Sequence, residues 1–103
     1  MELVKEIYDV TNDFPKSELY GLTQQIRRCA VSVPSNIAEG RGRGTDPQLA
    51  HFLDIAQGSA FELETQLYLS NRLQFLDKVK TDVLIIKVTT LQKMIDGFKY
   101  RIS

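Results

Sequence analysis

Tryptophan is absent from this 103-residue sequence, and cysteine and histidine each occur once. The lone cysteine, Cys29, cannot form a disulfide within the chain. With one histidine, His51, and one cysteine, the chain has too few imidazole and thiolate ligands for a metal site that needs several of them. No Glu-x-x-His spacing occurs, which excludes the carboxylate-bridged di-metal site of some helical bundles. The composition therefore predicts no metal site and no cofactor.

Long hydrophobic runs are also absent. The longest one, Val83–Ile86, has four residues, far fewer than the ~20 that a membrane-spanning helix needs. The first ten residues carry charges where a secretory signal would have an apolar stretch. We therefore expect no membrane association and a cytoplasmic location.

Neither sign of charge is in excess, because 13 Lys and Arg residues balance 13 Asp and Glu residues. The charges are nevertheless unevenly placed along the chain. Residues 24–44 contain Arg27, Arg28, Arg41 and Arg43 against one glutamate, whereas residues 45–64 contain four carboxylates and no Lys or Arg. The two segments could pair with each other, within or between subunits, or the four arginines could contact the phosphates of a nucleic acid.

Apolar residues recur at helical spacing in the first half of the chain. A first helix is expected from the start to about Asn12, ended by Pro15. A second is expected from an N-cap at Ser17, with Pro34 kinking it rather than ending it, and with a stop at the glycine-rich segment 40–44. Its apolar stripe consists of Leu19, Leu22, Ile26, Cys29, Val33 and Ile37.

The second half predicts two further helices. Thr45 or Asp46 can cap the third, and Asp77 can cap the fourth. The third has one apolar stripe, made of Leu49, Phe52, Leu53, Ala56, Ala60, Leu63, Leu67 and Leu73. The fourth is apolar on more than one face, with Val83, Ile86, Met94, Phe98 and Ile102 on one side and Leu84, Ile85, Val88, Leu91 and Ile95 around it.

Four amphipathic helices with short connections and no strand pattern predict an all-α fold, an antiparallel up-and-down four-helix bundle that forms a single domain over residues 1–103. The additional apolar face of the fourth helix has two possible explanations. Self-association would cover it, or the first helix folds over it within one chain.

Nucleophilic catalysis has no support in the pattern. Cys29 falls on an apolar stripe, where a thiol behaves as a small hydrophobe, and Ser32 and Ser35 lack a Gly-x-Ser-x-Gly turn and a histidine partner. The string Gly40–Gly44 is neither a dinucleotide fingerprint nor a P-loop, because it lacks the required strand and the Gly-Lys-Ser/Thr sequence. We therefore expect no enzymatic activity.

Several strings of residues resemble one family. They are Glu18-Leu-Tyr-Gly-Leu22, Gln25-Ile-Arg-Arg28, Ala30-Val-Ser-Val-Pro-Ser-Asn-Ile-Ala-Glu-Gly40 and Ile55-Ala-Gln-Gly-Ser59 followed by Glu62-Leu-Glu64. The chain resembles the small bacterial four helix bundle proteins, also called S23 or 23S rRNA intervening-sequence proteins. This resemblance implies a four-helix bundle that assembles into a homopentamer. The accessory variability proteins of retroelements are similar in fold and bind nucleic acid through a strongly basic barrel.

Two functional hypotheses follow. The first is a non-enzymatic homo-oligomeric scaffold that contacts RNA or DNA through Arg27, Arg28, Arg41 and Arg43. The alternative is a protein–protein adaptor with no nucleic-acid binding, in which these arginines pair with the acidic third helix.

Overall fold

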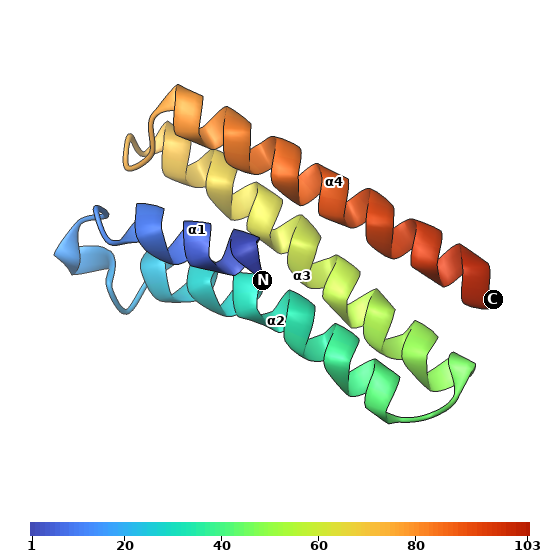
Figure 1. Ribbon diagram of the computed structural model, residues 1–103. Helices are drawn as coiled ribbons and strands as arrows, with labels where there is room; N and C mark the ends of the chain where they lie inside the picture. The colour runs from blue at the N-terminus through green and yellow to red at the C-terminus, as the bar shows by residue number, and fades with distance from the viewer.

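The computed structural model describes residues 1–103, which form four α-helices and no strand (Figure 1). The helices are α1 (Glu2–Thr11), α2 (Leu22–Gly42), α3 (Asp46–Arg72) and α4 (Lys78–Ile102), and a short 3₁₀ turn, η1 (Lys16–Glu18), lies between α1 and α2. The all-helical prediction and the number of helices are confirmed. None of the four helices combines the length and the apolarity that a bilayer span requires.

The predicted caps of the two long C-terminal helices are confirmed. The Thr45 hydroxyl accepts a hydrogen bond from the backbone N–H of Gln48, and the Asp77 carboxylate accepts one from the N–H of Lys80. Each side chain satisfies a donor that the first turn of a helix leaves free. The end of α1 at Thr11 also agrees with the predicted boundary near Asn12.

The predicted start of the second helix is wrong. Ser17 lies in η1, and the N-cap of α2 is Gly21. A carboxylate oxygen of Glu18 accepts a hydrogen bond from the N–H of Leu22, so the acidic residue one turn earlier replaces the hydroxyl cap. As a result Leu19 precedes the helix and is exposed rather than part of the buried stripe.

Helix α2 runs through Pro34 without ending, as predicted, but it also runs into the glycine-rich segment. It stops at Gly42, and of the three glycines in this segment Gly44 alone adopts a positive φ, of 87°. Gly40 has a different role. A Cβ built on it would lie 2.8 Å from the Cβ of Phe52, so α2 and α3 approach each other closely where the turn joins them.

Helix α3 lies between α2 and α4 and contributes the centre of the core. Five of its apolar residues are completely buried: Leu53, Ala56, Ala60, Leu63 and Leu67. The larger of two clusters of buried side chains joins α3 to α1, α2 and α4, and the smaller one, around Val33 and Ile95, joins α2, α3 and α4.

Two buried glutamines fix the alignment of α3 and α4. Gln57 donates through Nε2 to the backbone carbonyl of Gln92 and to Asp96, at 2.9 and 2.7 Å. Gln92 donates in turn to the carbonyl of Ala60 and to Glu64. Sliding α4 along α3 would leave these buried amides without partners, at a cost of about 1–3 kcal/mol for each group.

The first helix covers only part of the bundle. With 10 residues against 25 in α4, α1 spans about 15 Å of a length of about 37 Å. It packs beside the first half of α2, and its N-terminus lies about midway along the molecule (Figure 1). One end of the molecule therefore has four helices and the other end has three.

We expect Gly40→Ala to lower the free energy of unfolding by about 1–3 kcal/mol, because the added methyl group overlaps Phe52. Gly58→Ala is the matched control, since Gly58 is also helical and a Cβ there meets nothing within 4 Å. That control should gain up to about 1 kcal/mol from helix propensity alone. Urea unfolding followed by circular dichroism checks both values, and equal effects of the two substitutions would contradict the close approach.

Candidate interaction surface

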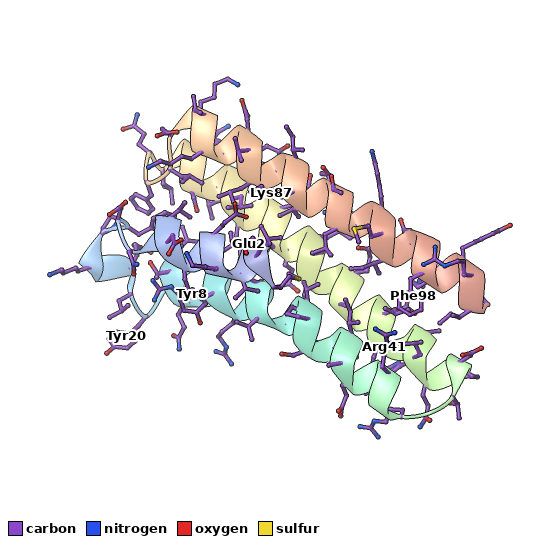
Figure 2. All side chains as sticks on the ribbon, in the orientation of Figure 1. Glu2, Tyr8, Tyr20, Arg41, Lys87 and Phe98 are labelled. Atoms are coloured by element: carbon purple, nitrogen blue, oxygen red, sulfur yellow. The ribbon has the colours of Figure 1, made fainter.

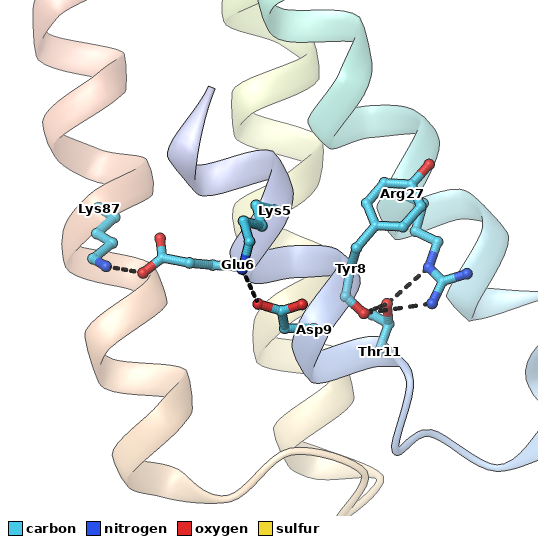
Figure 3. Close-up of polar contacts among 7 residues, drawn as sticks. All are labelled: Lys5, Glu6, Tyr8, Asp9, Thr11, Arg27 and Lys87. Carbon is cyan, nitrogen blue, oxygen red and sulfur yellow. Dashed lines mark hydrogen bonds and ion pairs between the residues drawn. The ribbon is translucent and has the colours of Figure 1, made fainter.

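Arg27, one of the four arginines predicted to bind nucleic acid, holds α1 against α2 (Figure 3). Its Nε donates to the Thr11 hydroxyl at 2.8 Å and its Nη2 donates to the side-chain oxygen of Asn12 at 3.0 Å. The guanidinium also lies over the ring of Tyr8, 4.6 Å from its centroid. These contacts give Arg27 a structural role within the chain.

The other three arginines differ in their surroundings. Arg43 forms an ion pair with Glu39 at 2.8 Å and lies over the ring of Phe52. Arg28 is exposed and has no carboxylate within 4.0 Å. Arg41 lacks a carboxylate partner as well, and its guanidinium lies 5.9 Å from the centroid of Phe98.

Helix geometry separates the four arginines further. Residues one or two apart on a helix do not share a face, so Arg27 and Arg28 point in different directions, as do Arg41 and Arg43. The structure therefore does not bring the four predicted residues together into one basic surface.

A different pair of arginines lies beside Phe98, which Figure 2 labels together with Arg41 at the three-helix end. Arg101 lies on the ring of Phe98, 5.7 Å from its centroid, so this ring contacts one arginine from α2, Arg41, and one from α4. Lys93 lies on α4 one to two turns before Phe98. Neither Lys93 nor Arg101 has a carboxylate within 4.0 Å. Sequence reasoning missed Lys93 and Arg101 because they are distant from the arginine-rich segment in the chain.

Lys93 and Arg101 border a hollow of about 430 Å³ between α2 and α4. We call it the α2–α4 valley. Its lining is otherwise apolar and includes Ile37 from α2 and, from α4, Leu91, Met94, Ile95 and Phe98. A second hollow, of about 390 Å³, lies between the first turns of α1 and the middle of α4, and Leu91 and Met94 line both.

The apolar face of α4 is not covered by α1. Four residues, which we call the α4 stripe, are between 47 and 74% exposed: Val79, Val83, Ile86 and Met94. The polar contact of α1 with α4 is an ion pair between Glu6 and Lys87 (Figure 3). The explanation that the first helix folds over the fourth is therefore correct for Leu84 and Val88, which are buried in one cluster with Leu3 and Ile7, and wrong for the exposed stripe.

The carboxylates of α3 have partners other than the arginines of α2. Asp54 pairs with Lys99 of α4, Glu64 accepts a hydrogen bond from Gln92, and Glu62 accepts one from the Cys29 thiol. The hypothesis that the basic and acidic segments pair within one chain is thus not confirmed. The carboxylates of α3 instead contact a lysine and a glutamine of α4 and the cysteine of α2.

Cys29 is half-buried and carries a proton at neutral pH. Burial, with a smaller effect of the adjacent Glu62 charge, raises the pKa of its thiol from 9.0 to about 11. His51, the other residue considered for chemistry, is exposed and packs edge-on against Phe52. No group of three or more His, Cys, Asp or Glu residues is arranged to hold a metal ion.

The whole chain up to the last turn of α4 matches one protein family. The family is described as 23S rRNA-intervening sequence protein, and its match covers residues 1–97. The chain belongs to the 23S rRNA-intervening sequence protein family. No match was found among curated proteins. The resemblance inferred from the strings around Pro34 and Gly58 is confirmed.

Family membership places both candidate surfaces inside the matched region or at its edge. The α4 stripe, the α2 arginines and most of the α2–α4 valley lie within residues 1–97, whereas Phe98 and Arg101 lie just beyond it. The family match identifies neither surface, and both come from the structure of this chain.

We expect Cys29 of this 23S rRNA-intervening sequence protein to react slowly with iodoacetamide. A pKa raised from 9.0 to about 11 leaves about 100-fold less thiolate at pH 8 than in the unfolded chain, partly offset by the greater nucleophilicity of a more basic thiolate. The folded protein should therefore react about 10- to 100-fold more slowly than the same protein in urea. Glu62→Gln should speed the reaction, and equal rates in the folded and unfolded states would contradict the raised pKa.

Proposed function

We propose that this 23S rRNA-intervening sequence protein is a non-enzymatic, homo-oligomeric scaffold in the cytoplasm, built from antiparallel up-and-down bundles. The observation that carries the proposal is the exposed α4 stripe. Val79 and Ile86 are 74 and 65% exposed on a helix whose opposite face is already buried in the core. Such a surface is costly for a lone monomer in water and is typical of a subunit contact.

The apolar stripe supplies a sizeable driving force. Covering one half-exposed aliphatic side chain contributes roughly 1 kcal/mol, and each contact in a symmetric assembly covers several. The family resemblance implies a ring of five chains, in which every subunit uses two different surfaces. The α4 stripe is one of these surfaces in the proposal, and the rigid packing of α3 against α4 holds it in place.

Light scattering on a sizing column tests self-association. The native chain should elute with the mass of about five subunits, and Val83→Lys combined with Ile86→Lys should shift it to the monomer, because two charges interrupt the apolar contact. Ile55→Lys is the matched control, since Ile55 is a similarly exposed aliphatic residue on α3. A native monomer, or a double variant that stays assembled, would contradict an α4 contact, whereas dissociation by the control would place Ile55 on the second surface of the ring.

Nucleic-acid contact is a second candidate function, and the unpaired arginines favour it. Arg28 and Arg41 are exposed and have no carboxylate within 4.0 Å, so their charges are available to phosphates. Repetition of these two residues around a ring would raise the overall affinity through avidity, although each single contact is weak. Arg27 and Arg43 contribute less in this proposal, because each already contacts groups within the chain.

Fluorescence anisotropy with structured RNA and with duplex DNA tests this second function. Replacement of both Arg28 and Arg41 by alanine should weaken binding at low salt and lower the slope of log affinity against log salt by about 2. Arg43→Ala is the control, and it should change the slope little because Arg43 is paired with Glu39. If the native protein shows no salt-sensitive binding, the nucleic-acid function is wrong and the protein–protein adaptor takes its place.

A further inference from the structure

A small pocket lies where α1 ends and α2 begins, and we call it the α1–α2 pocket. Its volume is about 120 Å³, which is room for about four water molecules. This is the size of one small anion and too little for a nucleobase or a peptide. Every residue that lines it belongs to the segment 11–27, so the pocket is formed within one stretch of chain and shares no residue with the α4 stripe.

The wall of the pocket contains a buried hydroxyl group with no partner. Thr23 is 3% exposed, and its Oγ1 is buried and makes no hydrogen bond. A threonine inside a helix commonly donates to the carbonyl one turn earlier, as Thr81 does to Asp77 at 2.7 Å. Buried polar groups are almost always paired, so an unpaired one calls for an explanation. Because Thr23 lines the pocket, a group bound there can supply the missing partner.

The other unused polar groups around the pocket are donors. Arg27 holds Thr11 and Asn12 through Nε and Nη2, which leaves its Nη1 without a partner (Figure 3). Lys16 also lines the pocket, and neither Lys16 nor Arg27 has a carboxylate within 4.0 Å. No Asp or Glu is among the lining residues. Two cations that border one small pocket repel each other, and an anion between them removes that repulsion.

The first turn of α2 adds to this preference for an anion. The carboxylate of Glu18 accepts the N–H of Leu22, but the N–H of Thr23 has no acceptor within the chain. Free N–H groups and the positive end of the helix dipole favour negative charge at the start of a helix. The unpaired hydroxyl, the two cations and the start of α2 therefore meet at the same pocket.

We propose that the α1–α2 pocket binds a tetrahedral oxyanion of the phosphate class. Lys16 and Arg27 supply the positive charge, and the hydroxyl of Thr23 donates a hydrogen bond to one of the oxygens. Hydrogen bonds to an ionised oxygen are stronger than those to a neutral one. A carboxylate has only two oxygens and would leave some of these donors unpaired. The anion is free phosphate or the terminal phosphate of a larger molecule, and both present the same chemistry to the pocket.

Calorimetric titration of the whole chain with inorganic phosphate tests the proposal, with sodium chloride holding the ionic strength constant. Phosphate should bind saturably, one per chain, and at least tenfold more tightly than acetate. An RNA trinucleotide with a 5′-phosphate, compared with its 5′-hydroxyl form, separates the two sources of the anion. Tighter binding of the phosphorylated RNA than of inorganic phosphate would assign the pocket to a terminal phosphate, and the reverse order would assign it to free phosphate.

Variants of the protein locate the bound anion. Thr23→Val should weaken phosphate binding about tenfold, and it should not lower the melting temperature in phosphate-free buffer, because the hydroxyl it removes is unpaired. Thr81→Val is the matched control, since Thr81 is also 3% exposed but its hydroxyl is paired. That control should lower the melting temperature and leave phosphate binding unchanged. Lys16→Ala should also weaken binding, whereas Lys80→Ala, at an exposed lysine of α4, should not.

Three outcomes would overturn the proposal. One is the absence of saturable phosphate binding, and another is binding that the Thr23 and Lys16 changes leave unaffected. The third is a lower melting temperature of Thr23→Val without phosphate, which would show that the hydroxyl is paired within the chain. The result is separate from the nucleic-acid function proposed above, because replacement of Arg28 and Arg41 by alanine should leave the affinity for inorganic phosphate unchanged: neither residue lines the pocket.

Discussion

Burial of α3 between its two long neighbours is the constraint on which the rest of the structure depends. Its alanines, Ala56 and Ala60, are completely buried and allow close approach, while Leu53, Leu63 and Leu67 fill the space above and below them. Because α3 contacts α2 on one side and α4 on the other, the backbones of α2 and α4 stay apart, and these two helices meet through side chains such as Arg41 and Phe98. The α2–α4 valley exists because this central helix holds its two neighbours apart.

Much of the fold follows from local chemistry that the sequence displays directly. Thr45 and Asp77 are short polar residues placed just before apolar periodic segments, and both cap helices as predicted. The start of α2 could not be predicted in the same way. Ser17 was predicted to cap the helix, but the carboxylate of Glu18 in η1 accepts the hydrogen bond from the first turn instead. Gly40 was interpreted as a helix stop, since its close approach to Phe52 depends on how α2 and α3 pack.

The candidate site was less predictable than the fold. The sequence analysis grouped four arginines because they are close together in the chain. In the structure, however, Arg27 hydrogen-bonds to α1 and Arg43 forms an ion pair with Glu39. Two arginines do meet at the ring of Phe98: Arg41 comes from α2 and Arg101 from the last turn of α4. Residues about 60 apart in the chain meet there only after α3 has placed both helices, so no local pattern marks them.

The unequal lengths of α1 and α4 have a consequence for motion. At the four-helix end, α4 is held by α3 and by the ion pair of Lys87 with Glu6, whereas its last turns lie beside α3 and side chains of α2 but not beside α1. Local opening of a helix costs less where fewer neighbours hold it. The amides of the final turns of α4 therefore exchange with solvent sooner than those around Val88.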